Sequence, residues 1–155
     1  MIARVHITAR ADYAVRAVCE LAARLPGSAT RQELAETQAI PGKFLESILG
    51  DLRRAGLLDS QRGSSGGYRL ARDPAEIPLA DIIRAIEGPL AAVRGMPPED
   101  TDYPGAARHL TQVWVAVRAS MREVLESTSV ADVFSGELPD EVSRLTEQPD
   151  SWARR

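Results

Sequence analysis

Residues 40–70 constrain the fold of this chain more than any other stretch. The first half of the stretch predicts a helix, because its apolar side chains recur at helical spacing and would line one buried face. These side chains are Phe44, Leu45, Ile48, Leu49 and Leu52. Pro41 is typical of a helix start, and Gly56 is typical of a helix end. The stretch therefore opens with an amphipathic helix whose polar face is available for other contacts.

The second half of the stretch predicts a hairpin. Residues 57–61 and 68–71 are short strand candidates, and the loop 62–67 between them is rich in glycine, which permits unusual backbone angles. A helix followed directly by an arginine-bearing hairpin is the layout of a winged-helix DNA reader. In that layout the helix enters the major groove, and the hairpin reaches the adjacent backbone or minor groove.

Two further helices are predicted before this stretch. The first covers residues 8–25, with Thr8 as its N-cap. Its apolar stripe consists of Ala14, Val18, Leu21 and Leu25. Thr30 and Glu33 have the spacing of a capping box, so a second helix is expected from there to about residue 38. A short turn then leads into the amphipathic helix, which completes a helix-turn-helix.

The longest helical pattern follows the hairpin. After a shorter predicted helix at residues 79–87 and a loop at 95–105, residues 106–127 carry an apolar heptad seam. The seam begins at Ala107 and continues through Leu110, Trp114, Val117, Met121 and Val124. A small core cannot cover such a seam, so we expect two copies of the chain to pack along it as a homodimer. The alternative is that this helix packs onto its own domain.

The expected fold class is mainly α with a small β-wing. We expect a winged helix-turn-helix domain at residues 1–94, a loop and dimerisation helix at 95–134, and a polar C-terminal tail at 135–155 without regular structure. A short extra helical turn is expected at 130–134. No run of about 18 apolar residues is present, so we expect no membrane association. The start of the chain lacks an apolar signal core, and a single cysteine suits the cytoplasm.

The charges are distributed unevenly along the chain. The net charge is −3, yet residues 1–72 hold 11 Lys and Arg against 7 Asp and Glu, a net charge of +4. Residues 73–155 hold 8 basic against 15 acidic residues, a net charge of −7. This asymmetry is expected when only the front half of a protein meets DNA.

The chain carries three motifs, which are ITARADYAVRAVCELA near the start, IP-x-x-FLE-x-IL-x-x-L-x-x-AGL-x-x-S-x-RG-x-x-GGYRLAR in the centre and IPLADIIRAIEGP after it. Over roughly residues 5–130 these motifs resemble the Rrf2 family of bacterial transcription regulators. The resemblance implies a homodimeric winged-helix protein that binds double-stranded DNA. For several members it also implies an iron–sulfur cluster that senses iron, nitric oxide or redox state.

The central helix carries the first group of candidate DNA-binding residues. The resemblance assigns base readout to Lys43, Glu46 and Ser47, and these residue types can bond to base edges. An alternative role for Glu46 is to hold an arginine or lysine in place. Arg53 and Arg54 are expected to contact phosphates or to complement the helix dipole.

The hairpin carries the second group. Arg62 heads a loop with little side-chain bulk, so we expect it to enter a narrow minor groove. Ser64 and Ser65 can bond phosphates. Tyr68 is expected either to pack beneath the wing or to bond a phosphate.

The start of the first helix is the third candidate. Thr8 and Arg10 are placed where helix amides and a positive side chain can clamp a phosphate. The alternative is a capped helix end on the surface, and the sequence alone favours neither. The resemblance favours the phosphate contact, because in the family this helix end lies on the DNA side.

Cysteine content argues against the family's cluster chemistry. The loop 94–108, where cluster-bearing members carry their cysteines, contains none, so a conventional three-cysteine cluster is excluded and no cofactor is expected. The alternative is a site that bridges two subunits through two Cys19 residues and two His or Asp residues. We interpret Cys19 as a small core residue, with a redox thiol as the alternative. One cysteine, the distant His6 and His109, and no clustered carboxylates leave no catalytic triad or zinc set, so an enzyme is not expected.

The residues thus predict a sequence-specific DNA-binding transcription regulator. We expect a repressor that binds a pseudo-palindromic operator as a homodimer. Its signal would be a small-molecule effector, a partner protein, or a thiol switch at Cys19. The alternative from another class is a winged-helix module for protein interaction without an operator. An acidic or apolar face at Arg10, Lys43, Arg54 and Arg62 would favour that alternative.

Overall fold

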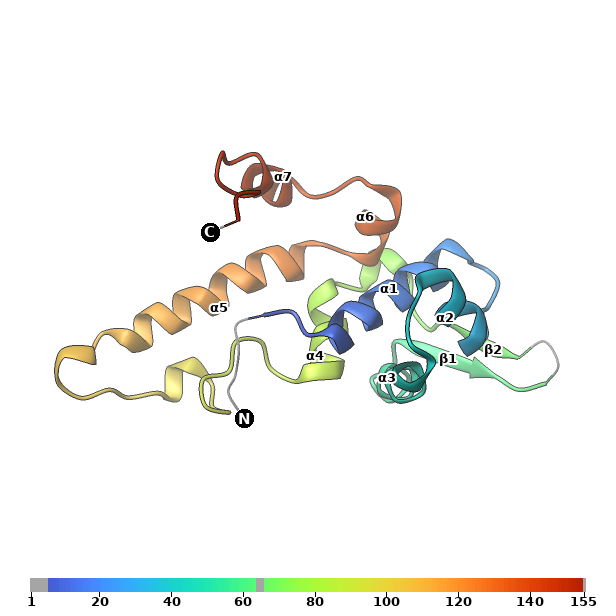
Figure 1. Cartoon of the computed structure of the whole chain (residues 1–155), viewed down its shortest axis with the longest axis horizontal. Coiled ribbons are helices and arrows are strands. Elements are labelled where there is room, and N and C mark those ends of the chain that lie inside the picture. The colour runs from blue at the N-terminus through green and yellow to red at the C-terminus, as the bar shows by residue number, and fades with distance from the viewer. Residues whose placement is uncertain (1–5, 64–65, 155) are drawn as a thin grey trace.

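A bundle of helices that carries a two-stranded hairpin lies at one end of the molecule, and the long helix α5 extends from it as an arm (Figure 1). The computed structural model describes residues 6–63 and 66–154. The α-helices are α1 (Ala9–Ala23), α2 (Arg31–Gln38), α3 (Gly42–Arg54), α4 (Leu79–Glu87), α5 (Leu110–Ser127), α6 (Val130–Ser135) and α7 (Asp140–Thr146). The strands are β1 (Leu58–Gln61) and β2 (Gly67–Leu70), and the short 3-10 helices are η1 (Pro74–Glu76), η2 (Pro98–Asp100) and η3 (Gly105–Ala107). This architecture confirms the expected fold class.

Helix α1 lies within the bundle and packs against α3, α4 and α6. The apolar stripe of α3 is buried in this core as predicted, and its fully buried members are Leu45, Ile48, Leu49 and Leu52. Phe44 is only half-buried and packs against the ring of Tyr13, with the two ring centroids 5.8 Å apart. The stripe predicted for α1 is wrong at Leu25, which is 42% exposed because the helix already ends at Ala23.

The helix-turn-helix forms where its local signals predict it. The side chain of Thr30 accepts from the backbone N–H of Glu33, and the Glu33 carboxylate accepts from the N–H of Thr30 at 2.7 Å. This second hydrogen bond also holds the pKa of the Glu33 carboxyl below its usual value. Ala39 adopts a left-handed conformation with φ 51°, which reverses the chain between α2 and α3. Pro41 then takes the N-cap position of α3.

The hairpin is joined to the loop between α1 and α2. Strands β1 and β2 pair antiparallel, and Ala29 adds one bridge to β2 through Tyr68. The N–H of Ala29 donates to the carbonyl of Tyr68 at 2.9 Å, and the reverse hydrogen bond measures 2.8 Å. A Cβ atom on Gly67 would lie 2.6 Å from the carbonyl oxygen of Ala29. Glycine is therefore required here by a close backbone approach, and the run of glycines is more than a flexible turn.

The arm begins later than predicted and ends at the predicted residue, Ser127. The predicted helix at 79–87 is confirmed as α4, but α5 begins at Leu110 because the residues before it form η3. Ala107 lies in η3 and is not part of the α5 seam, which corrects the predicted start. After the arm, α6 forms at the expected place and returns to the bundle, where Val130 is fully buried and its N–H donates to the carbonyl of Ile77 at 2.9 Å.

The seam of α5 is only partly covered in the single chain. All residues of α5 are described, and none of its side chains is fully buried. On one side the arm is held by its own preceding loop, because Trp114 Nε1 donates to Tyr103 Oη at 3.0 Å and Arg118 pairs with Glu99. Beside the seam, Val113 is 50% exposed. An 18-residue helix with an apolar face and no buried side chain is the pattern of an incomplete interface.

The C-terminal segment is more ordered than its composition suggested. The prediction of a tail without regular structure is wrong for Asp140–Thr146, which form α7. Beyond it, Trp152 Nε1 donates to the carbonyl of Thr146 at 2.8 Å, although the Trp152 residue is 80% exposed. In the described ranges, no helix is both long and apolar enough to cross a membrane.

Candidate nucleic-acid interface

The polar face of α3 points away from the core. Lys43, Glu46 and Ser47 are exposed on the first two turns, while Leu45 between them is buried and Phe44 is half-buried. The ammonium nitrogen of Lys43 lies 5.1 Å from the centroid of the Phe44 ring, and among the described residues it has no ion pair. The predicted reading residues are therefore accessible on one helix face, at the helix end that approaches base edges in helix-turn-helix proteins.

Glu46 is paired with a residue that the sequence did not single out. Its carboxylate lies 3.1 Å from Nη1 of Arg31, at the start of α2, and the Glu46 side chain remains 80% exposed. Arg31 and Lys43 both border a shallow groove between α2 and α3. Glu46 thus holds an arginine in place in the free protein, which was one of its two predicted roles.

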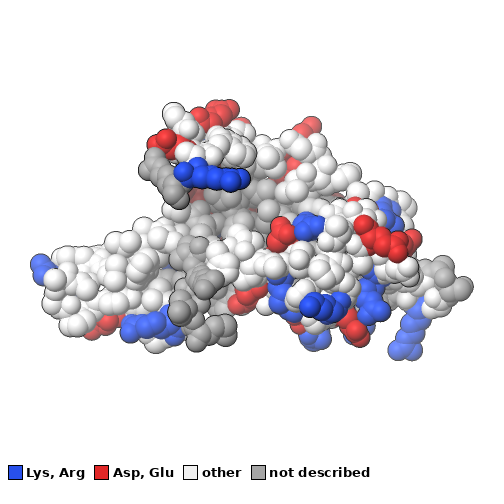
Figure 2. Space-filling view, in the orientation of Figure 1, with Lys and Arg blue, Asp and Glu red and all other residues white. Residues whose placement is uncertain are grey.

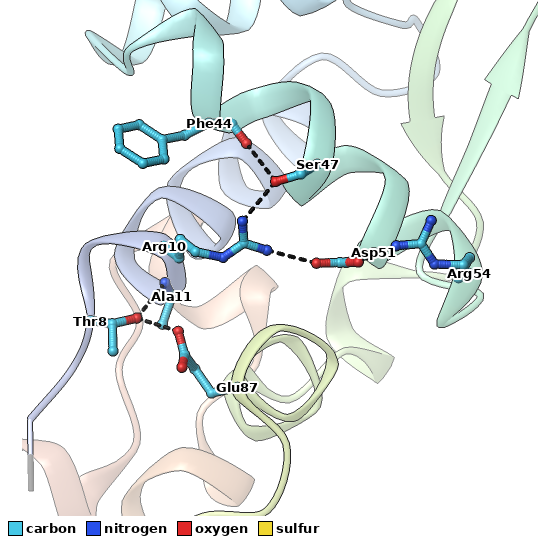
Figure 3. Close-up of polar contacts among 8 residues, drawn as sticks. All are labelled: Thr8, Arg10, Ala11, Phe44, Ser47, Asp51, Arg54 and Glu87. Carbon is cyan, nitrogen blue, oxygen red and sulfur yellow. Dashed lines mark hydrogen bonds and ion pairs between the residues drawn. The ribbon is translucent and has the colours of Figure 1, made fainter. Parts of the chain in front are cut away.

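Arg10 connects the start of α1 to α3. Its Nη1 donates to Ser47 Oγ at 2.7 Å, and its Nη2 lies 2.7 Å from Asp51 Oδ2 (Figure 3). The other carboxylate oxygen of Asp51 accepts from Arg54. Asp51 was not among the predicted site residues, and its position on α3 gave no sign of the partner on α1. The arrangement neutralises a carboxylate that would otherwise stand uncompensated on this face.

Thr8 caps α1 and is bonded to the end of α4. Its side-chain oxygen accepts from the N–H of Ala11 at 3.1 Å, and its hydroxyl donates to the carboxylate of Glu87 (Figure 3). The Glu87 carboxylate therefore lies at the α1 N-terminus, where a negative charge complements the helix dipole. This geometry is that of a capped helix end tied to a neighbouring helix.

Replacing Thr8 by alanine is expected to lower the free energy of unfolding by about 1 kcal/mol, because it removes the side-chain cap at the N-terminus of α1. The measurement is chemical denaturation of the free protein, without any DNA. Thr8→Ser retains the capping hydroxyl and serves as the control. Equal stability of Thr8→Ala and the unaltered protein would contradict a capping role.

Two exposed arginines of the wing, Arg62 in the loop and Arg69 in β2, have no partner among the described residues. Arg62 is exposed and makes no hydrogen bond or ion pair within residues 6–63 and 66–154. Ser64 and Ser65, also predicted to contact DNA, lie outside the described residues. Tyr68 is half-buried and packs against the core, in agreement with packing beneath the wing. Arg53 donates to Ser60 Oγ at 3.2 Å and so connects α3 to β1.

Basic side chains gather over α3 and the hairpin. In the space-filling view they line the lower edge of the bundle with some acidic side chains among them, and further acidic side chains stand out over α2, α6 and α7 (Figure 2). Arg10 and Arg54 are neighbours along this edge, because both contact Asp51, and Arg10 also contacts Ser47. In this view the bundle therefore carries charges of both signs, with the basic side chains concentrated along its lower edge.

Cys19 lies half-buried on α1 and packs against the core. Burial raises the pKa of its thiol from 9.0 to about 11, so the thiol is protonated at neutral pH. A protonated thiol is a poor nucleophile and a poor metal ligand. This environment favours the interpretation of Cys19 as a core residue.

Alkylation of Cys19 by iodoacetamide at pH 7 is expected to be about 100-fold slower in the folded protein than in the denatured chain. The reason is that a pKa of about 11 instead of 9.0 leaves correspondingly less thiolate at that pH. The rate should rise with pH up to about 11. Mass spectrometry of timed samples measures the rate, and equal rates in the folded and denatured protein would contradict the burial argument.

Comparisons with known proteins agree on one family. The family model described as Rrf2, iron-dependent transcriptional regulator, matches residues 7–136. A Mycobacterium tuberculosis protein named as a candidate HTH-type transcriptional regulator is 48% identical over 142 residues, which cover 91% of this chain and 88% of that protein. The HTH-type transcriptional regulator CymR of Bacillus subtilis is 35% identical over 130 residues, covering 83% of this chain and 89% of CymR.

Solved structures show the same similarity. The structure of CymR, described as the global cysteine regulator of B. subtilis, matches with a TM-score of 0.72 at 32% identity, covering 84% of this chain and 97% of that one. The structure of IscR from T. potens matches with a TM-score of 0.70, also at 32% identity, covering 85% and 88% of the two chains.

The iron named in the family description does not fit the donor atoms of this chain. The chain has one cysteine, and its buried thiol is held in the protonated form. Across the described ranges, no group of three or more His, Cys, Asp or Glu side chains is arranged to hold a metal ion. A cysteine-ligated iron–sulfur cluster needs several thiolates, which one subunit cannot supply.

Proposed function

Because this chain belongs to the Rrf2 family of transcriptional regulators, we propose that it binds a pseudo-palindromic operator as a homodimer and represses transcription. The family match and the named relatives make it a DNA-binding regulator and not an enzyme. The observation that carries the proposal is the shared basic edge of α3 and the wing, where reading side chains are exposed beside arginines. A basic edge favours binding to a polyanion such as DNA. The alternative of a protein-interaction module would instead require an acidic or apolar face at this place.

We assign two kinds of contact to this edge. Lys43, Glu46 and Ser47 read base edges in the major groove, and Arg53 and Arg54 bind phosphates. In the wing, Arg62 enters the minor groove and Tyr68 supports the hairpin from beneath. The backbone of the loop, together with Ser64 and Ser65, binds phosphates.

The dimer is supported by the uncovered face of α5. In the proposed dimer, two arms pack along the seam that consists of Leu110, Trp114, Val117, Met121 and Val124. A two-fold axis then places two copies of α3 at equivalent grooves, with half-sites centred about 34–36 Å apart or a multiple of that spacing. Since one chain has a single cysteine and its described residues hold no group of metal ligands, we propose a small-molecule effector or a partner protein as its signal, and the cytoplasm as its location.

Selection of bound duplexes from a random pool by the purified full-length protein tests the function. We expect an inverted repeat with two half-sites, and affinity that falls steeply as salt is raised, because phosphate contacts release counterions. Recovery of no enriched sequence would contradict the proposal. An enriched single half-site without symmetry would contradict the dimeric operator alone.

A further inference from the structure

We propose that Arg10 is a positioning residue for base readout, which fixes the Ser47 hydroxyl so that it donates to an acceptor on a base edge. The inference rests on the proposed function, because it takes α3 as the reading helix. It differs from the direct phosphate contact that the sequence suggests for Arg10. The difference matters because a phosphate contact carries affinity, whereas a positioned hydroxyl carries sequence preference.

The geometry resembles a clamp across one turn of α3. Ser47 and Asp51 are four residues apart, so their side chains lie on the same helix face. The guanidinium of Arg10 spans both, with 2.7 Å from Nη1 to Ser47 Oγ and 2.7 Å from Nη2 to Asp51 Oδ2 (Figure 3). Its side chain is only 35% exposed, and that of Asp51 only 24%. A planar guanidinium can hold two acceptors in a fixed arrangement, which a lysine cannot do.

This clamp determines what the Ser47 hydroxyl can offer. One lone pair of Oγ accepts from Arg10, and the positive guanidinium weakens the oxygen as an acceptor for a second donor. The contact from Ser47 Oγ to the carbonyl of Phe44 measures 3.4 Å, which is a poor hydrogen bond. The O–H group is therefore available for an outside acceptor. In the major groove such acceptors are guanine O6 and N7, adenine N7 and thymine O4.

Asp51 keeps Arg10 in this position. One of its carboxylate oxygens takes Arg10, and the other takes Arg54. Because the charge of Arg10 is compensated by Asp51, Arg10 is held to the protein and not drawn to the DNA backbone. Asp51 is thus the second member of the device, and its negative charge is tolerated on the DNA-facing edge because two arginines share it.

The test measures discrimination between the selected operator and versions changed at single base pairs, by fluorescence anisotropy. We expect Ser47→Ala to lower discrimination at one base pair by roughly three- to tenfold, the range of one hydrogen bond. Arg10→Lys should lower discrimination at the same base pair to a similar extent, although it preserves the charge. The double variant should lose no more than either single variant, because both remove one interaction.

Two further readouts separate positioning from phosphate binding. Arg10→Gln should leave the salt dependence of binding nearly unchanged, because Arg10 makes no phosphate contact, whereas loss of a phosphate contact would lower the salt slope by about one. Asp51→Asn removes a negative charge, so it should raise affinity for any DNA and still lower discrimination at the base pair of Ser47. Circular dichroism confirms that each variant is folded before binding is compared.

Several outcomes would overturn the inference. One is an Arg10→Lys variant that discriminates between base pairs as well as the unaltered protein does. Another is an Arg10→Lys substitution that lowers discrimination by the same factor in the Ser47→Ala variant as in the unaltered protein. An enriched operator that Ser47→Ala reads as well as the unaltered protein would overturn this inference and leave the proposed function standing. Failure to enrich any operator would instead count against the proposed function.

Discussion

Val117→Asp is expected to raise the dissociation constant of the proposed dimer at least about 100-fold. Val117 lies in the apolar seam of α5, where no side chain is fully buried in the single chain. Burying a valine contributes about 1.5–3 kcal/mol, and a two-fold axis repeats each substitution in the partner copy. An aspartate at that place also brings a charge into an apolar contact, which costs further free energy. Loss of the dimer should also lower the affinity for the operator, because each monomer then binds only one half-site.

Sedimentation over a range of protein concentrations measures this effect. Ala119→Asp is the matched control, because it adds the same charge to an exposed residue on another face of α5. Retention of helix content by circular dichroism shows that α5 still forms in each variant. A Val117→Asp protein that stays as dimeric as the control would show that the seam packs within its own chain.

Arg62→Ala is expected to weaken operator binding by roughly 1–3 kcal/mol, or about 5- to 150-fold. Arg62 is exposed on the wing and, as far as the described residues show, has no partner within the protein. Its side chain is therefore available for the narrow minor groove, where the negative potential of DNA is concentrated. Because the residue is exposed, its loss should leave the stability of the free protein nearly unchanged.

Binding of operator DNA at two salt concentrations measures the effect. Arg108→Ala removes the same charge between η3 and the start of α5, outside the wing and α3, and serves as the control. A loss that is equal for the two variants would mean that only net charge matters. No loss for Arg62→Ala would remove the wing from the mechanism.

The features that the sequence predicted are those set by local signals. The stripe of α3 has helical spacing, and its members are buried as expected, with Leu45 and Ile48 at 0% exposure. The capping box of Thr30 and Glu33 needs residues only three positions apart, and it begins α2 where predicted. The boundaries of α4 were also predicted, because Gly88 follows its last residue directly.

The features that the sequence did not reveal depend on residues far apart along the chain. Asp51 takes its role from Arg10, 41 positions away, and no pattern on α3 identifies that partner. Gly67 was part of a plain glycine-rich loop in the sequence, but its close approach to Ala29 is a tertiary contact. Helix α7 was missed for another reason, since polar composition concealed a local Glu141–Arg144 ion pair.

The site itself was predicted in part. The exposure of Lys43, Glu46 and Ser47 on α3 follows from helix periodicity, and the packing of Tyr68 against the core is one of the two roles that the sequence left open for it. The pairing of Glu46 with Arg31 does not, because it joins α3 to the start of α2 across 15 positions. Thr8 and Arg10 were singled out for a phosphate contact, with a capped helix end as the alternative. In the structure Thr8 donates to Glu87, and Arg10 donates to Ser47 and Asp51, so both side chains connect helices within the protein.

Hydroxyl-radical footprinting of the full-length protein on its selected operator tests the central claim most directly. A symmetric pair of third helices and wings predicts two inverted, protected half-sites on one face of the duplex, centred about 34–36 Å apart or a multiple of that spacing. Protection of a single half-site, or protection without two-fold symmetry, would contradict the account.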